Sequence, residues 1–266
     1  MVTVVIPVWD DYVEFLGDAV ESVRRNDPGA PIVVVDNASS TPVPQLDGTE
    51  VLRSARRLTE GAARNLGLEC VTTELVMFLD ADDMLLDGAI EFMRGRIASD
   101  PGLAVSAVSV LDGGTGERHR NPRRFAMRLA RRPRAFALAN CVWSLLPIPG
   151  SAIVRTDAAR AAGGYADSDL GEDWDLGAAL AWRGRVEISE RLGRYYRSHD
   201  GSAGRRARSA RQLRASARRV RERIRRDPAV PAWAKSLMPL VAALQLAAVY
   251  VARPAYLRVR GSSARH

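Results

Sequence analysis

The stretch VMFLDADDMLL, residues 76–86, joins a continuous apolar run to three carboxylates. The run VMFL is typical of a strand that is buried on both faces of a sheet. Asp80, Asp82 and Asp83 follow it, and carboxylates are rarely buried without a partner. We therefore expect these three side chains to face water, a cation or a basic partner at the end of a buried strand.

Strands alternate with helices on either side of this stretch. Runs of β-branched or apolar residues at 2–6, 32–35 and 103–111 predict further strands, and apolar residues at helical spacing predict helices between them. This alternation is typical of an α/β fold with a mostly parallel, doubly wound sheet. Ligands of such sheets bind at the carboxyl ends of the strands, where Asp36 and Asp80 lie.

Polar residues and glycines mark the expected helix boundaries. Thr59, Asp87 and Thr156 stand where helices are expected to start, and the pair Gly163-Gly164 is expected to end the helix after Thr156. After residue 113 the pattern loosens into an arginine-rich stretch with two prolines, which we expect to be a mobile segment.

The Asp-x-Asp pattern at the strand end has a direct chemical interpretation. A tight turn brings the carboxylates of Asp80 and Asp82 to the same crevice, and hard oxygen ligands suit Mg²⁺ or Mn²⁺, which often arrive with substrate phosphates. A solvated loop with helix-capping aspartates is the alternative interpretation.

Composition describes a globular chain of 266 residues, of which 47% are hydrophobic. Its two cysteines, Cys70 and Cys141, have no CxxC pattern or histidine neighbour, so they indicate a reducing compartment and neither a disulfide framework nor a zinc site. The first residues, MVTVVIPVW, lack a basic segment and a cleavage site, so we do not expect export through a signal peptide.

Charge divides the chain at about residue 201. Residues 201–266 hold sixteen Lys and Arg against two acidic residues, a net charge of +14, and residues 1–200 carry −6. We therefore expect an acidic body over 1–202 and a basic, apolar helical tail over 203–266, with separate tasks.

Six motifs occur in order: VTVVIPVWD, IVVVDNAS, GAARNLGL, FLDADD, GEDWDL and RYYRSHDGS. Together they resemble the inverting family 2 glycosyltransferases of the GT-A fold. The resemblance covers about residues 2–202. It implies an enzyme that moves a sugar from a nucleoside-diphosphate sugar to an acceptor hydroxyl, in the biosynthesis of a glycan, of the cell envelope or of a glycosylated metabolite. It also implies Mn²⁺ or Mg²⁺ as cofactor.

The resemblance also implies roles for individual residues. Glu172 would orient the base or bind the acceptor. The donor would contact the end of the first strand, with Asp36 on the nucleobase, Arg64 near the base or pyrophosphate and Asp80 on the ribose. Asp82 would coordinate the metal that bridges the diphosphate, and His199 would complete the metal or diphosphate site. Asp173 would be the base that deprotonates the acceptor, Trp174 would stack on the acceptor sugar, and Pro7 and Val8 would contact the donor.

The chain departs from the family pattern at three places. Trp9-Asp10 replaces the usual Tyr-Asn after the first proline, and Asn37 replaces a frequent second aspartate, so the contacts to the base are less defined than the metal site. Asp83 is an additional acid, which we expect to be a solvated cap or a support for its neighbours. The alternatives to a glycosyltransferase are a nucleotidyltransferase and a non-catalytic protein that binds sugar nucleotides or nucleic acid.

The tail combines an arginine run with an apolar stretch. Residues 205–226 contain eleven arginines with apolar residues at three- to four-residue steps, which predicts an amphipathic helix. Residues 237–252 are too few for a confident membrane span. Three interpretations stay open: packing on the enzyme, contact with a second subunit, and peripheral binding to the inner face of a membrane through anionic lipid. Nucleic acid is not indicated, because no aromatic residues are interleaved with the arginines.

Overall fold

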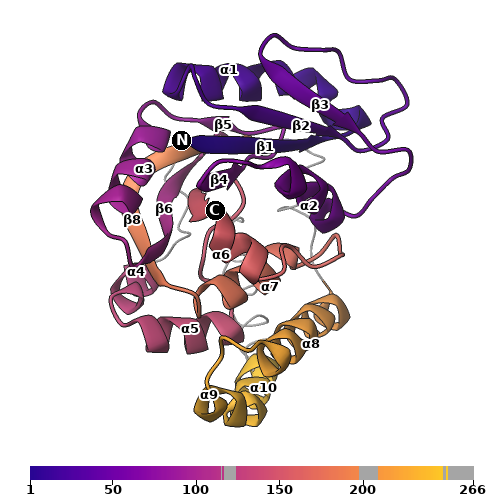
Figure 1. Cartoon of the computed structure of the whole chain (residues 1–266). Coiled ribbons are helices and arrows are strands. Elements are labelled where there is room, and N and C mark those ends of the chain that lie inside the picture. Colours follow the sequence, from indigo (N-terminus) through magenta and orange to yellow (C-terminus); the bar gives the residue numbers. More distant parts are fainter. Residues whose placement is uncertain (115, 117–123, 198–208, 248–249, 251–266) are drawn as a thin grey trace, which may run out of the picture.

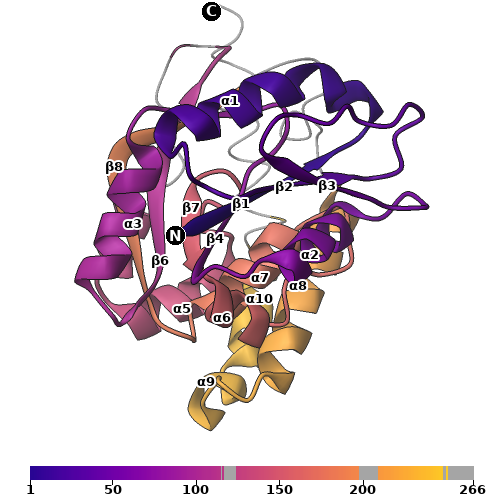
Figure 2. The same ribbon diagram turned by 45° about the horizontal axis from the view of Figure 1, so that its top comes forward.

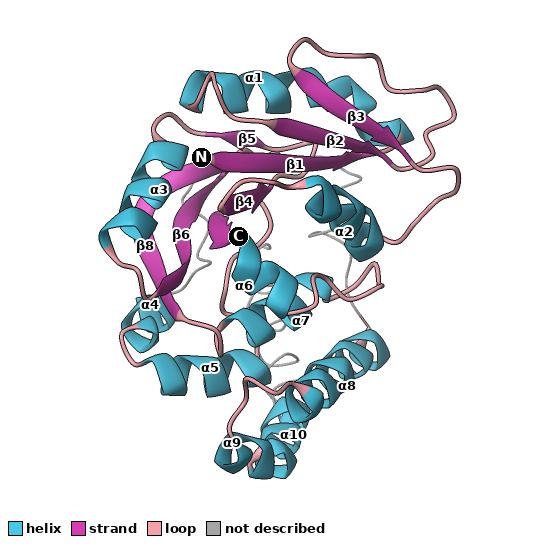
Figure 3. Ribbon diagram, viewed as in Figure 1, coloured by secondary structure: helices cyan, strands magenta, loops and turns pink. Residues whose placement is uncertain are grey.

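The structure is a computed structural model and describes residues 1–114, 116, 124–197, 209–247 and 250. One eight-stranded sheet carries helices on both faces (Figures 1 and 3). The strands are β1 (Val2–Val8), β2 (Ile32–Asp36), β3 (Thr49–Arg53), β4 (Leu75–Phe78), β5 (Met84–Leu85), β6 (Leu103–Asp112), β7 (Ala152–Arg155) and β8 (Arg185–Tyr196). The helices are η1 (Asp10–Phe15), α1 (Leu16–Asn26), α2 (Glu60–Cys70), α3 (Ala89–Ser99), α4 (Arg124–Ala130), α5 (Pro133–Val142), α6 (Thr156–Ala161), α7 (Glu172–Leu180), α8 (Ala210–Arg226), α9 (Ala232–Ser236) and α10 (Met238–Ala247).

The strand order is β3-β2-β1-β4-β7-β6-β8-β5. Strands β1 to β4 run parallel to one another, β7 lies antiparallel to both β4 and β6, and β8 pairs parallel with β6. The register pairs Val8 with Asp36, so β1 and β2 end side by side. The predicted α/β class with a mostly parallel sheet is confirmed.

Alternation along β1 distributes its side chains between two core clusters. Val2, Val4, Ile6 and Val8 pack on one face with α1 and α3. Val5 points to the other face, which α2, α4, α5, α6 and α7 cover. Successive side chains of a strand point to opposite faces, so the continuous run VTVVIPV is apolar because both faces are covered.

The predicted helix boundaries are confirmed in two cases. The Thr59 hydroxyl accepts a hydrogen bond from the amide of Ala62 at 3.2 Å and so caps α2. Both Gly163 and Gly164 have positive φ, and they end α6. The prediction for Thr156 is wrong, because this residue is the first of α6 and Arg155 precedes it as the cap position without a side-chain hydrogen bond.

One further prediction about the middle of the chain needs correction, and another is not tested. The helix expected to start at Asp87 is α3, and it begins only at Ala89 because Gly88 precedes it in a left-handed conformation. In the arginine-rich stretch, residues 124–130 form α4 and Pro133 begins α5, and its mobility stays a prediction.

The C-terminal helices lie against α5 and α7 (Figures 1 and 2). Ala217, Val220 and Ile224 of α8 share a hydrophobic cluster with residues of α5, α7 and α10. The guanidinium of Arg223 pairs with Asp175 of α7, and the bidentate pair of Arg183 with Asp227 is buried. The predicted amphipathic helix therefore exists, and its thin apolar face packs on the enzyme. The division of the chain at 202 into two domains stays a prediction.

None of the helices in the described residues is both long and apolar enough to cross a bilayer.

Candidate active site

Three strands bring predicted donor-site residues to one edge of the sheet. Val8 and Asp36 are the last residues of β1 and β2, and Asp80 follows β4 after one intervening residue. The backbone of Val8 and of Pro7 can face this edge, but the Val8 side chain lies in the core. Topology therefore gathers these residues as the sequence predicted.

The carboxylate of Asp36 is buried and has its hydrogen-bond partners within the protein. Its carboxylate is 1% exposed and accepts hydrogen bonds from the amides of Ser39 at 2.9 Å and Val43 at 3.3 Å, and it pairs with Arg53. Burial alone would raise the pKa of Asp36, but the hydrogen bonds outweigh burial, so the pKa lies below its ordinary value. To contact the nucleobase as predicted, the Asp36 carboxylate would have to accept a further hydrogen bond on an oxygen that already has a partner in the protein.

Asp80 lies between two arginines that come from distant parts of the chain. Arg64 Nη2 of α2 donates to Asp80 Oδ1 at 2.8 Å, and Arg194 Nη2 of β8 lies 3.4 Å from Oδ2. Both arginines are largely buried, with side chains 5% and 11% exposed. The carboxylate of Asp80 is therefore positioned by the protein before any ligand arrives.

Asp83 is fully buried, so the expectation of a solvated cap is wrong. Its carboxylate pairs with Arg194 and accepts a hydrogen bond from the amide of Arg197 at 3.0 Å. Burial raises the pKa of Asp83 to about 7, although Arg194 acts in the opposite direction. Asp83 thus fastens the loop of Asp80 and Asp82 to β8, which agrees with the other expectation, that Asp83 supports its neighbours.

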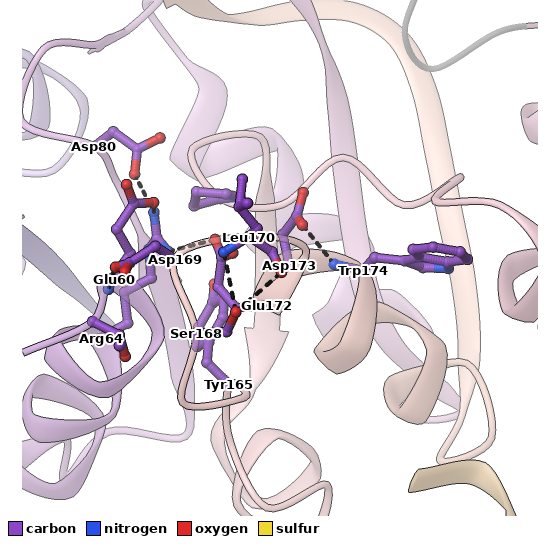
Figure 4. A network of polar contacts seen from close by, with 12 residues as sticks. Glu60, Arg64, Asp80, Tyr165, Ser168, Asp169, Leu170, Glu172, Asp173 and Trp174 are labelled. Atoms are coloured by element: carbon purple, nitrogen blue, oxygen red, sulfur yellow. Dashed lines mark hydrogen bonds and ion pairs between the residues drawn. The ribbon is translucent and has the colours of Figure 1, made fainter. Parts of the chain in front are cut away.

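Arg64 joins the Asp80 loop to the start of α7 (Figure 4). Its Nη1 donates to Glu172 Oε1 at 2.9 Å while its Nη2 donates to Asp80, and the guanidinium lies over the ring of Tyr165. Glu60 is 3.8 Å from Nη2. One buried cation therefore links the predicted donor site to the predicted acid pair.

Burial and the neighbouring Asp173 raise the pKa of Glu172 to about 7, although Arg64 favours the ionised form. The Glu172 side chain is only 7% exposed. A carboxyl that is buried, paired and close to neutral in pKa suits a residue that orients its neighbours, and perturbed groups of this kind gather at functional sites.

Asp173 lies in the first turn of α7, beside Glu172, and is partly exposed. Its Oδ1 accepts a hydrogen bond from the amide of Trp174 at 2.7 Å (Figure 4). A carboxylate at a helix start is favoured electrostatically by the helix dipole. The structure thus brings together Arg64, Asp80, Glu172 and Asp173 as the sequence expectation requires, while the role of Asp173 as base stays a prediction.

Trp174 does not face an acceptor cleft in this structure. The residue is 8% exposed, its indole Nε1 donates to the carbonyl of Asn140 at 2.5 Å, and its ring packs in the cluster formed with α8 and α10. In this structure the Trp174 ring is therefore a core side chain and does not stack on a sugar as predicted, because the C-terminal helices cover it.

The motif GAARNLGL is explained by the close approach of α2 to the segment before α7. A Cβ on Gly61 would lie 1.9 Å from the carbonyl oxygen of Ala166, so only glycine fits at this position. Asn65 exchanges two hydrogen bonds with the backbone of Tyr165, at 2.8 and 2.9 Å. These contacts set the position from which Arg64 reaches Glu172.

Two arginines at the end of β8 were not predicted from the sequence. Arg194 holds Asp80 and Asp83 and donates to the carbonyl of Pro149 at 2.6 Å, and Arg197 Nε donates to the carbonyl of Asp82 at 3.1 Å. The motif RYYRSHDGS contains both residues, and its two arginines on either side of a tyrosine pair were the available signal.

His199, the second residue predicted for the metal site, lies outside the described residues. Within the described chain no group of three or more His, Cys, Asp or Glu side chains is placed to hold a metal. Mg²⁺ and Mn²⁺ can be bound by one or two carboxylates together with substrate phosphates and water. Asp82, in a loop with two arginine-paired aspartates, fits that kind of site.

Comparison with solved structures supports the GT-A fold. S. aureus TarS 1-349, determined in complex with UDP-GlcNAc, has a TM-score of 0.68 at 15% identity, covering 94% of this chain and 73% of that one. The same protein in complex with UDP has a TM-score of 0.66 at 14% identity, covering 93% and 71%.

Comparison with sequences gives the family. Two pre-mycofactocin glycosyltransferases, from Mycobacterium tuberculosis strains CDC 1551 / Oshkosh and ATCC 25618 / H37Rv, are each 34% identical over 202 residues. The match covers 72% of this chain and 40% of each relative, so the chain spans about two fifths of their length. The model of glycosyl transferase family 2 matches residues 3–160, more than half of the chain. The chain therefore belongs to glycosyl transferase family 2.

Proposed function

We propose that the chain is a metal-dependent inverting glycosyltransferase, which moves a sugar from a nucleoside-diphosphate sugar to an acceptor hydroxyl. The observation that carries the proposal is the Asp80–Arg64–Glu172 chain of ion pairs, which ties the Asp-x-Asp loop to the acid pair across 2.8 and 2.9 Å contacts. A protein that only bound nucleotides would not need a buried cation to hold an acid pair beside the binding loop.

The donor side needs charge neutralisation, because the leaving group is a nucleoside diphosphate. A divalent cation held by Asp82 would supply that neutralisation when bound. Asp80 is fixed by Arg64 and Arg194, so it can accept from the ribose hydroxyls without reorganising. Asp83 keeps the loop on β8 through its pair with Arg194.

The acceptor side needs a base. In the proposal Asp173 takes the proton of the attacking hydroxyl, and this attack from the side opposite the diphosphate inverts the anomeric carbon. Glu172, held by Arg64 at 2.9 Å, orients the first turn of α7 and places a second carboxyl group beside Asp173. Two neighbouring carboxyl groups retain one proton between them more easily near neutral pH, because both ionised together would repel each other.

The acceptor is a glycan, a lipid-linked sugar or a small molecule. Because the relatives are named pre-mycofactocin glycosyltransferases, we place pre-mycofactocin among the acceptors to be tested first. We also propose that the chain works in the cytoplasm, at the inner face of a membrane. Its free cysteines suit a reducing compartment, and its C-terminal helices are strongly basic.

Thermal melting with nucleotides tests the donor and metal assignments together. A nucleoside diphosphate with Mn²⁺ or Mg²⁺ should raise the melting temperature of the wild type, since a ligand that binds the native state stabilises it. Asp82→Asn should lose the part of this shift that requires metal, and EDTA should stop sugar transfer by the wild type. Transfer that continues at full rate in EDTA would contradict the metal role of Asp82.

A further inference from the structure

Helix α10 is oriented with its polar residue inward and its leucines outward. Its sequence, MPLVAALQLA, contains one polar side chain, Gln245, which is 3% exposed. Gln245 Nε2 donates to the carbonyl of Cys141 at 2.7 Å, and its oxygen accepts from Arg221 of α8. The side of a soluble helix that faces water is normally the polar one. Here this arrangement is reversed.

The outward side of α10 is apolar along its whole length. Leu240 is 57% exposed, Leu244 47% and Leu246 44%, and Tyr250 beyond the helix is 51% exposed. Ala243 and Ala247 are also exposed. We define the apolar face as residues Leu240, Ala243, Leu244, Leu246, Ala247 and Tyr250. Met238 and Val241, on the inward side, are already buried against the enzyme, so the apolar face is not needed for that packing.

A row of arginines on α8 lies beside the apolar face. Helices α8 and α10 pack together, and Arg214 Nη1 donates to the hydroxyl of Tyr250 at 3.0 Å, with its guanidinium 5.9 Å from the ring centroid. Four of the five exposed arginines of α8 recur at steps of three, four and seven residues, so these four share one side of the helix. We define the arginine row as Arg211, Arg214, Arg218 and Arg225.

We propose that the apolar face of α10 and the arginine row of α8 form a docking surface for an anionic membrane. Leucines and a tyrosine bordered by cations are the composition of helices that lie in the interface of a bilayer. The arginine row fits anionic headgroups by charge. A second copy of this chain is disfavoured as the occupant, since a symmetric contact would bring two arginine rows together. The proposal rests on the membrane location proposed above and is independent of the sugar-transfer reaction.

Vesicle sedimentation with the full chain tests the surface. The wild type should bind vesicles that contain anionic lipid and bind neutral vesicles weakly, and added salt should weaken the binding because it screens surface charge. Leu240→Ser with Leu244→Ser should reduce binding at least about tenfold, because the two exposed leucines would lose their insertion into lipid. Phe125→Ser is the matched control, because Phe125 is 61% exposed on α4, and it should bind as the wild type does.

The arginine row is tested separately. Arg211→Gln with Arg214→Gln should weaken binding by about fivefold per arginine, the factor that corresponds to about 1 kcal/mol each near an anionic surface. The control is Arg128→Gln with Arg131→Gln, which removes the same charge from exposed residues around α4.

Three results would overturn the proposal. The first is absence of wild-type binding to anionic vesicles, and the second is equal loss in the control and test pairs. The third is a wild type that is dimeric in solution and becomes monomeric in the leucine variant, which would assign the apolar face to a second copy. Melting temperature and transfer to a soluble acceptor should stay unchanged in the leucine variant, which separates this test from a test of the reaction.

Discussion

Gly61→Ala is a small change that should damage both stability and catalysis. The new Cβ would lie 1.9 Å from the carbonyl oxygen of Ala166 and 3.3 Å from the Cβ of Glu172, so α2 and the segment before α7 must separate by about 1 Å. Overpacking of this kind costs about 1–3 kcal/mol. We expect the melting temperature to fall by about 3–10 °C. Since the shift also moves Arg64 relative to Glu172, transfer should fall by about tenfold to a hundredfold.

Gly95→Ala is the matched control. Gly95 lies in the middle of α3, and a Cβ added there would meet nothing within 4 Å, so alanine introduces no clash. Alanine in a helix interior is favoured over glycine by about 0.5–1 kcal/mol, which should raise the melting temperature by about 1–4 °C and leave transfer unchanged. Calorimetry and initial rates of sugar transfer would measure both variants. A Gly61→Ala protein with wild-type melting and wild-type rate would refute the role given to the contact between α2 and Ala166.

Two further predictions concern the buried ion pairs. Arg194→Met should lower the free energy of unfolding by about 1–3 kcal/mol in urea, because the buried carboxyl of Asp83 and the carbonyl of Pro149 lose a hydrogen-bond donor. Arg25→Met breaks only exposed pairs, with Glu21 and Asp87, and should change the free energy of unfolding by less than about 0.5 kcal/mol; similar losses in both would contradict this account. Glu172 has a folded-state pKa of about 7, above its ordinary 4.5, so the native state retains a proton that the unfolded chain releases. The stability it contributes is fully present below pH about 4.5 and is lost as the pH rises through about 7, and Glu172→Gln should flatten that part of the profile of stability against pH. The charged groups around Glu172 are Glu60, Arg64 and Asp173. If Glu172→Gln leaves the profile of stability against pH unchanged, a group other than Glu172 causes the pH dependence.

Local patterns were sufficient for strands β1, β2, β4 and β6 and for the positions where β2 and β4 end. Apolar runs closed by Asp36 and Asp80 predicted β2 and β4, and the Thr59 cap predicted the start of α2, because each signal lies within a few residues of its effect. The family resemblance added the acid pair on α7, and the structure places Glu172 beside Arg64.

Contacts between distant residues could not be predicted in the same way. Asp83 looked solvated because its partner, Arg194, is 111 residues further along the chain. Trp174 looked available to a sugar because the helices that cover it follow only after residue 209. The glycine of GAARNLGL was recognised as part of a motif, but its cause, the carbonyl of Ala166, lies about a hundred residues away in the sequence.

The rate of sugar transfer by Asp173→Asn, measured beside its affinity for the nucleoside diphosphate, tests the central claim most directly. Loss of a general base costs about 10²–10⁴ in rate. The account predicts a loss of that size with nucleotide affinity close to the wild-type value, since Asp173 lies on α7 and the donor site on the strand ends. A transfer rate near that of the wild type would contradict the assignment of Asp173 as the base.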